Sequence, residues 1–351
     1  MGKRSSPEPV VAPQPSFDPV EDDWQDDTEA ESGPEPDWPR REAVVPAGIR
    51  GQRLDVFLVT LVPDFSRSYL KTLVESGLVR VDGVGVDSAS RKVSAGQRVE
   101  IELKPTPQSQ AFTPEAMDLP IVFEDEHMLV VNKPAGLVVH PAAGNWTGTL
   151  MNGLLAHHSG AVDLPRAGIV HRLDKDTSGL MVVGKTIQAV TALSRAIAAR
   201  SVSRQYLALV HGAPPASFTV DAPIGRDPAT RVRMAVLASG KEARTDVQCL
   251  LTGEIDGALQ PISGVRCTLH TGRTHQIRVH LSHRKYPLVA DALYGGSPAL
   301  GLTRQALHAT RLALAHPVSG ESMVWEAAMP LDMAQAWDEL SRTPQLSIRG
   351  A

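Results

Sequence analysis

The sequence has 351 residues, of which 42% are hydrophobic, and its formal net charge is −4. A chain of this length and composition can bury a substantial core and has room for two domains, so a wholly disordered protein is excluded. Residues 1–41 hold four cations and eleven anions, a net charge of −7, and the rest of the chain carries +3. A positive net charge as small as +3 does not by itself indicate binding of nucleic acid.

The two cysteines, Cys249 and Cys267, show no CxxC spacing, and the N-terminus does not resemble a signal peptide. We therefore expect no disulfide framework and no thiolate metal site, and we interpret both cysteines as buried apolar residues. No apolar run reaches the length needed to cross a bilayer. These features favour a cytoplasmic protein that has no membrane partner.

Residues 1–44 are dominated by Pro, Glu, Asp and Ser. A segment of this composition cannot bury enough apolar surface to offset the entropy of the chain, so we predict a disordered acidic, Pro-rich tail. The tail could recruit a partner through Trp24 and Trp38, compete with a polyanion for the rest of the chain, or serve only as a solvating extension. The sequence leaves these alternatives open.

Residues 45–104 predict a compact unit of two short helices and a small sheet. Residues 53–58 have the apolar spacing of a helix, and Ser66 can cap a second helix. Residues 79–83 alternate and end on Asp82-Gly83, which predicts a hairpin. The prolines of residues 105–114 predict a linker after this unit.

The cations of this first unit are candidate contacts for phosphate groups. Arg67 and Lys71 lie four residues apart, so they would share one face of the second helix. The cations and anions of the unit nearly balance, however, and a small charged module without a ligand is the alternative.

Residues 115–345 contain the remaining predicted elements. We expect a strand, turn and strand over residues 121–133, further strands at 169–170, 180–183, 203–212, 265–269 and near 324–325, and helices at 150–158, 189–199, 274–281 and 332–340. Thr274 is placed to cap the third of these helices.

The most informative stretch is the charged loop between the apolar residues 169–170 and 180–183. It presents Asp174 between Arg172 and Lys175, and such neighbouring cations keep a carboxylate ionised. An ionised carboxylate on a fixed scaffold suits acid-base or nucleophilic chemistry. The alternative is an exposed turn held by salt bridges.

Two further patterns point to other chemistry. Residues 179–186 fit the phosphate-loop pattern GxxxxGK[ST], but the interior Leu-Met-Val-Val predicts a strand rather than a flexible loop, so we do not expect an NTPase. His275, His280 and His283 suggest a metal site, but the spacing of the first two places them on different helix faces. We expect no metal there.

The motif HRLDKDTSGL at residues 171–180 resembles the catalytic signature of the RluA-type pseudouridine synthases, which convert uridine in structured RNA into pseudouridine. NKPAGLVVHP at residues 132–141 and GRTHQIR at residues 272–278 are similar to segments of the same family and follow in the same order. Within residues 53–83, RLDVFL, SRSYLKTLVESG and VRVDG resemble the S4-type RNA-binding domain. The resemblance covers about residues 46–330, so it does not depend on a single motif.

This resemblance implies an α+β fold. A catalytic domain of the pseudouridine synthase type, built on a mixed, largely antiparallel sheet, would occupy residues 115–345 and follow a small α/β S4-type domain at residues 45–104.

The resemblance also implies roles for individual residues. Asp174 would be the catalytic carboxylate, Arg278 its ion-pair partner, and Tyr206 the ring that stacks on the target base. Arg172 is suited to fill the space that an extruded base leaves. By the same resemblance we expect substrate contacts from Lys133 and Arg273, and RNA contacts from Arg67 and Lys71.

The expected reaction is an isomerisation, which requires no metal or organic cofactor. Asp174 would attack the uridine at C1′ or at C6, and the sequence leaves both open. The S4-type domain favours large-subunit (23S) ribosomal RNA, alone or in a pre-ribosomal particle, as the partner. We expect the enzyme to be a monomer. The main alternative is an RNA-binding or ribosome-assembly protein that keeps the fold without the activity.

Overall fold

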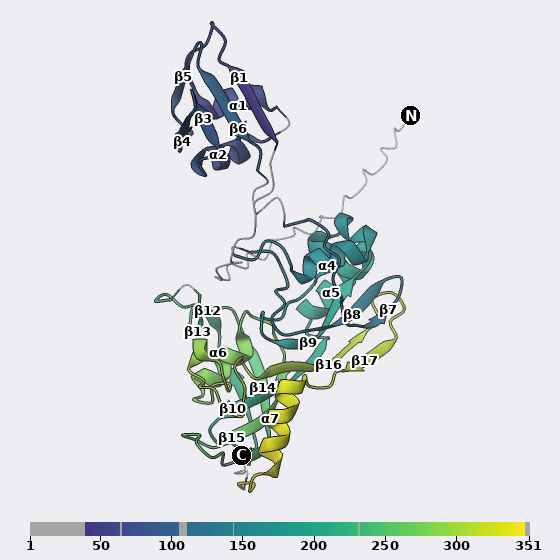
Figure 1. Cartoon of the computed structure of the whole chain (residues 1–351). Coiled ribbons are helices and arrows are strands. Elements are labelled where there is room, and N and C mark those ends of the chain that lie inside the picture. Colours follow the sequence, from purple (N-terminus) through teal and green to yellow (C-terminus); the bar gives the residue numbers. More distant parts are fainter. Residues whose placement is uncertain (1–38, 64, 105–110, 143, 231, 348–351) are drawn as a thin grey trace, which may run out of the picture.

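The computed structural model describes residues 39–63, 65–104, 111–142, 144–230 and 232–347 (Figure 1). Residues 1–38 of the predicted tail lie outside this range. The prediction that the tail extends to residue 44 is wrong, because Arg40–Val44 form strand β1, which pairs antiparallel with β6 (Arg98–Glu102). The main-chain hydrogen bonds of this pairing order a segment whose composition alone predicts disorder.

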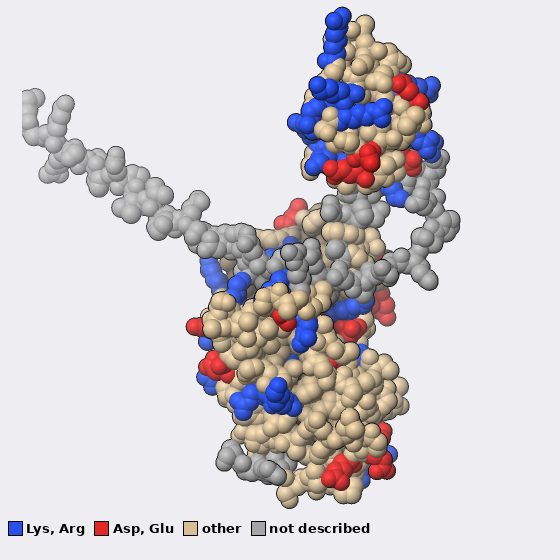
Figure 2. Space-filling view, turned by 90° about the vertical axis from the view of Figure 1, so that its left-hand side faces the viewer, with Lys and Arg blue, Asp and Glu red and all other residues tan. Residues whose placement is uncertain are grey.

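The first unit has the predicted two helices and small sheet. Helices α1 (Leu54–Leu61) and α2 (Arg67–Glu75) accompany a four-stranded sheet in the order β1-β6-β3-β4, with β3 at Val79–Val81 and β4 at Val84–Val86; β2 (Arg50–Arg53) pairs with β5 (Lys92–Ser94). The Ser66 side chain accepts a hydrogen bond from the Tyr69 amide, so the predicted cap is confirmed. Lys and Arg side chains gather on one face of this unit (Figure 2).

The predicted linker is only partly supported. Residues 105–110 lie outside the described residues. The Ala111 and Thr113 carbonyls accept hydrogen bonds from Asn152 Nδ2, at 3.2 and 2.9 Å. The last part of the predicted linker therefore packs on the domain that follows it.

That domain is built on a nine-stranded sheet in the order β11-β14-β15-β10-β16-β9-β8-β7, with β17 paired to β16. Its strands are β7 (Ile121–Glu124), β8 (Met128–Lys133), β9 (Ser178–Gly184), β10 (Ser203–His211), β11 (Ser217–Asp221), β14 (Arg244–Gly253), β15 (Ile262–Leu269), β16 (Leu307–Ala315) and β17 (Ser322–Glu326). Only β16 and β9 pair in parallel in this sheet of described residues, so the prediction of a mixed, largely antiparallel sheet is confirmed.

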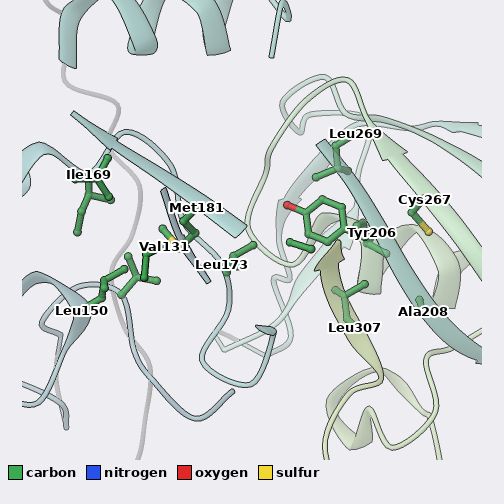
Figure 3. Packing of buried hydrophobic residues seen from close by; sticks show 14 of the residues in the cluster. Val131, Leu150, Ile169, Leu173, Met181, Tyr206, Ala208, Cys267, Leu269 and Leu307 are labelled. Atoms are coloured by element: carbon green, nitrogen blue, oxygen red, sulfur yellow. The ribbon is translucent and has the colours of Figure 1, made fainter. Parts of the chain in front are cut away.

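Among its described residues, the domain has four α-helices: α4 (Leu150–His157), α5 (Ile187–Ala198), α6 (Gln276–His283) and α7 (Leu331–Arg342). A short ribbon, β12 (Ile224–Arg226) with β13 (Met234–Val236), lies beside α6. Figure 3 shows part of the main core, where side chains of the sheet meet Leu150 of α4 and Leu173 of the charged loop. The loop that carries Asp174 is thus anchored in the core.

Two local predictions are wrong. Ile169 forms only an isolated bridge with Val183, not a strand. Helix α6 is preceded by His275 in the left-handed conformation, with no side-chain cap, so Thr274 does not cap it.

The resemblance to a phosphate loop is contradicted by β9. Every residue from Ser178 to Gly184 is buried, and the strand pairs with β8 from Gly179 to Gly184. Its amide groups are therefore not available to cradle a phosphate.

Gly179 allows the parallel pairing that holds the start of β9. It has φ +117°, and a Cβ at this position would lie 2.5 Å from the Ala309 nitrogen in β16. We expect Gly179→Ala to lower the free energy of unfolding by about 3 kcal/mol or more. The alanine would adopt a strained φ, and the Ala309 backbone would also have to move away from the new Cβ. The control is Gly320→Ala, where φ is +74° but no atom lies within 4 Å; it should cost only about 1 kcal/mol. If urea unfolding showed equal losses of stability for Gly179→Ala and Gly320→Ala, the close approach of Ala309 would not be the reason for glycine at position 179.

Candidate active site

Asp174 follows the buried Leu173 and lies before β9. The amide of Thr177 donates to the Asp174 carbonyl at 3.1 Å, and His171 Nε2 accepts from the Val182 amide at 3.0 Å. The Asp174 side chain is 15% exposed. A tightly held loop therefore presents a carboxylate that is nearly buried but can be reached from solvent.

Arg278 in α6 joins Asp174 to a second carboxylate. Its Nη1 donates to Asp174 Oδ2 at 3.1 Å, while Nε and Nη2 donate to Asp291 Oδ2 and Oδ1 at 2.8 and 3.0 Å. The Asp291 side chain is 1% exposed, and that of Arg278 is 7% exposed. A guanidinium held by a two-point contact to Asp291 has little freedom, so it approaches Asp174 in a fixed geometry.

The surroundings of Asp174 keep it ionised. Burial alone would raise its pKa, but His275, Arg278 and Arg172, together with the hydrogen bond from Arg278, outweigh burial and lower the pKa to about 2. The predicted grouping of Asp174 with Arg278 and Arg172 is therefore present in the structure. A carboxylate in this state can act as a nucleophile at neutral pH.

Tyr206 lies in β10 and is 5% exposed. Its ring belongs to the core around the charged loop (Figure 3). Burial raises the pKa of Tyr206 to about 12, and the charge of Asp174 acts in the same direction. Tyr206 is thus a neutral, protonated ring in the electrostatic neighbourhood of the carboxylate.

Lys133, at the end of β8, is held by contacts within the chain. Its side chain is fully buried, and Nζ donates to the carbonyls of Pro134, Leu137 and Lys175 at 2.9, 2.8 and 2.8 Å. All three ammonium hydrogens are used within the chain. The contact between Lys133 and the substrate stays a prediction. The residue ties the end of β8 to the loop that carries Asp174.

The burial of Lys133 predicts a specific pH dependence of stability. Burial lowers its pKa to about 7, against the opposing charges of Asp174 and Asp176. The unfolded chain, with an ordinary lysine pKa of about 10.4, binds more protons above pH 7, so this group makes the free energy of unfolding rise with pH up to about 10. Urea unfolding at about pH 7.5 and about pH 9 should show wild type gaining up to about 1.4 kcal/mol per pH unit relative to Lys133→Met. If wild type and Lys133→Met showed the same change of unfolding free energy with pH, Lys133 would remain protonated in the folded protein, held by its three carbonyl partners.

The other predicted RNA contacts have partners within the chain. Arg273 Nε donates to the Glu242 carbonyl at 3.0 Å. Arg67 donates through Nε and Nη2 to Asp55 Oδ2, at 3.1 and 2.8 Å, but its side chain is 56% exposed. Lys71 is 57% exposed and pairs with a glutamate one turn away, at 3.5 Å. The two helix cations thus remain accessible to solvent.

Sequence reasoning missed Asp291, Tyr294 and the position of His275. Asp291 is an isolated acid in a largely apolar stretch, which was the only signal of its burial. The Tyr294 ring lies against Arg278, with the guanidinium carbon 5.0 Å from the ring centroid. Its hydroxyl is 2.8 Å from His275 Nδ1. Asp291 and Tyr294 thus both contact Arg278, the ion-pair partner of Asp174.

No metal site replaces this interpretation. Within the described ranges, no group of three or more His, Cys, Asp or Glu side chains is arranged to hold a metal ion. His280, one of the histidines considered above, bonds instead to Thr245 and to the Ala222 carbonyl, each at 2.9 Å. Both cysteines are buried and free, as predicted.

Comparisons with known proteins give matches for both units of the chain. Residues 127–283 match the family model described as RNA pseudouridylate synthase, and residues 52–99 match the S4 domain. A protein of Nitrosomonas europaea named ribosomal large subunit pseudouridine synthase D is 45% identical over 88% of this chain and 90% of its own length. The chain belongs to the RNA pseudouridine synthase family.

Other members of the family are similar over comparable lengths. The synthase D of Neisseria meningitidis serogroup B is 46% identical over 91% of this chain and 86% of its own length. The solved structure of human RNA pseudouridylate synthase domain containing 1 has a TM-score of 0.50, is 28% identical and covers 66% of this chain and 97% of its own. The family makes this chain an RNA pseudouridine synthase, and the resemblance seen in the motifs is confirmed.

The part of the chain that the structure describes contains no helix that is long and apolar enough to span a bilayer.

Proposed function

We propose that this synthase converts uridines of large-subunit ribosomal RNA into pseudouridine, with Asp174 as the nucleophile. The observation that carries the proposal is the Asp174 carboxylate, which is nearly buried, ionised and bonded to Arg278 at 3.1 Å. The names of the similar synthases, which specify the ribosomal large subunit, support the choice of RNA. The S4 domain supports a structured RNA as the substrate.

The mechanism begins with extrusion of the target uridine, because a base in a stack cannot reach a nearly buried carboxylate. Arg172 fills the space that the base vacates, and the Tyr206 ring stacks on the extruded base. Arg278 holds the carboxylate for attack, so little reorganisation is needed when the covalent bond forms.

Asp174 then attacks C1′ of the ribose or C6 of the ring, and the N-glycosidic bond breaks. The detached base rotates and rejoins the ribose through C5. The hydrogen at C5 leaves as a proton and N1 gains one, so the product has the same atoms and oxidation state as the substrate. This balance is the reason that the reaction requires no metal or organic cofactor.

We further propose that the enzyme acts as a monomer in the cytoplasm, on ribosomal RNA either alone or in a pre-ribosomal particle. The first unit carries exposed cations that can contact RNA phosphates: Arg50, Arg53, Arg67, Lys71, Arg80, Arg91 and Lys92. Such a face suits the sequence-independent part of RNA binding.

Lys71 tests this role of the first unit. Its side chain is 57% exposed, so neutralising its ammonium should remove a phosphate contact without unfolding the unit. We expect Lys71→Ala to weaken RNA affinity by about threefold and to reduce the slope of log affinity against log salt by about one unit. Lys71→Arg, which keeps the charge, is the control. An unchanged slope in Lys71→Ala would remove Lys71 from the interface.

The function itself is tested with purified protein and two separate transcripts, one of small-subunit and one of large-subunit ribosomal RNA. Pseudouridine is detected by carbodiimide modification and reverse-transcription stops. The proposal predicts discrete sites in the large-subunit transcript only. Stops in neither RNA, while both RNAs are bound, would favour the non-catalytic RNA-binding protein.

A further inference from the structure

His275 occupies an unusual position directly before α6. Its backbone has φ 54° and ψ 21°, a left-handed conformation that side chains other than glycine seldom adopt. Its imidazole lies between two groups of the site, with Nδ1 2.8 Å from the Tyr294 hydroxyl and Nε2 3.9 Å from Asp174 Oδ1. Strain of this kind persists where the surrounding structure over-determines it, and it is concentrated at active sites.

The Tyr294 hydroxyl determines which imidazole nitrogen carries the proton. The Met234 amide in β13 donates to this hydroxyl at 2.9 Å. The hydroxyl has one hydrogen, and the only acceptor that the described residues bring within hydrogen-bonding distance is His275 Nδ1. Burial raises the pKa of Tyr294 to about 12, so the hydroxyl keeps this hydrogen at neutral pH. Nδ1 is therefore the acceptor, and the proton of the neutral imidazole lies on Nε2.

The two oxygens of Asp174 then differ. Oδ2 accepts a charge-assisted hydrogen bond from Arg278 at 3.1 Å, which reduces its ability to attack. Oδ1 faces the N–H of His275 Nε2 at 3.9 Å, a distance longer than a hydrogen bond, so the lone pairs of Oδ1 are less engaged than those of Oδ2.

We propose that His275, fixed by Tyr294 as the tautomer protonated at Nε2, is a positioning residue that orients the Asp174 carboxylate so that Oδ1 attacks the uridine. This inference rests on the proposed function, in which Asp174 is the nucleophile. It assigns a role to a residue pair, His275 and Tyr294, that lies outside the catalytic set expected from the sequence.

Amide substitutions of His275 separate the roles of its two nitrogens. The amide nitrogen of glutamine reaches the place of Nε2, whereas that of asparagine reaches only the place of Nδ1. We expect His275→Gln to keep kcat within about threefold of wild type, and His275→Asn to lower kcat by about tenfold with little change in KM. Activity of His275→Asn equal to or above that of His275→Gln would overturn the proposal.

Tyr294→Phe removes the hydroxyl but keeps the ring over Arg278. We expect it to lower kcat by about tenfold, and the double variant with His275→Asn to be no slower than His275→Asn alone, since both act through one hydrogen. Independent effects that multiply to about 100-fold would overturn the proposal. A variant that is only less stable would also lower apparent kcat at unchanged KM, so the non-additivity of the double variant is the readout that separates the two explanations.

Asp174→Asn in the same assay distinguishes failure of the proposed nucleophile from failure of the inference about His275. If Asp174→Asn retains turnover, the proposed function of Asp174 fails. If Asp174→Asn is inactive while His275→Asn and Tyr294→Phe both keep the kcat of wild type, only the inference about His275 fails.

Discussion

Asp174→Asn is expected to lower the single-turnover rate of pseudouridine formation by about 10⁴-fold or more, because it removes the attacking oxygen anion. The amide has the shape of the carboxylate, and Arg278 keeps its two hydrogen bonds to Asp291. RNA affinity should therefore change little. The rate is measured by release of tritium from RNA labelled at C5 of uridine, since formation of the new bond at C5 expels that hydrogen.

The control for this variant is Asp125→Asn, which neutralises a carboxylate in the turn between β7 and β8. Asp125 bonds to His316 Nε2 at 2.9 Å and to two nearby amides, so it contributes to local structure only. It should retain the rate of wild type within about threefold. Turnover by Asp174→Asn at a comparable rate would exclude Asp174 as the nucleophile.

Asp291→Ala is expected to have the second largest effect, on stability and activity together. Asp291 is 2% exposed and accepts two hydrogen bonds from Arg278. Its removal leaves a buried guanidinium with half of its counter-charge, which should lower the free energy of unfolding by about 3–5 kcal/mol. Because Arg278 is then no longer fixed, the single-turnover rate should also fall by about 100-fold.

Asp291→Asn is the matched variant, since it keeps one oxygen acceptor in the same place. Urea unfolding and tritium release should place it between wild type and Asp291→Ala. Wild-type stability and rate in Asp291→Ala would show that Asp174 alone is sufficient to hold Arg278.

Local patterns in the sequence predicted most of the elements correctly. The strand, turn and strand over residues 121–133 and the helix over residues 150–158 are present as β7, β8 and α4. In each case the pattern of apolar residues along a short segment determines which face is buried. Strand β1 was missed because its order comes from pairing with β6, more than fifty residues later, and not from its own composition.

The site was less accessible to such reasoning. Asp174 and Arg278 are separated by 104 positions, so no spacing rule brings them together, and only the resemblance of their motifs to one family did so. Lys133 has the same sequence signature as an exposed loop lysine. Its three carbonyl partners lie in two loops, and the spacing of apolar residues in the sequence does not predict the conformation of those loops.

The clearest test of the account is a map of pseudouridine across cellular RNA, made by carbodiimide-based sequencing. A strain that lacks this protein is compared with strains complemented by wild type or by Asp174→Asn. The account predicts that sites in large-subunit ribosomal RNA disappear on deletion and return only with wild type. A map that is unchanged by deletion, or that Asp174→Asn restores, would contradict it.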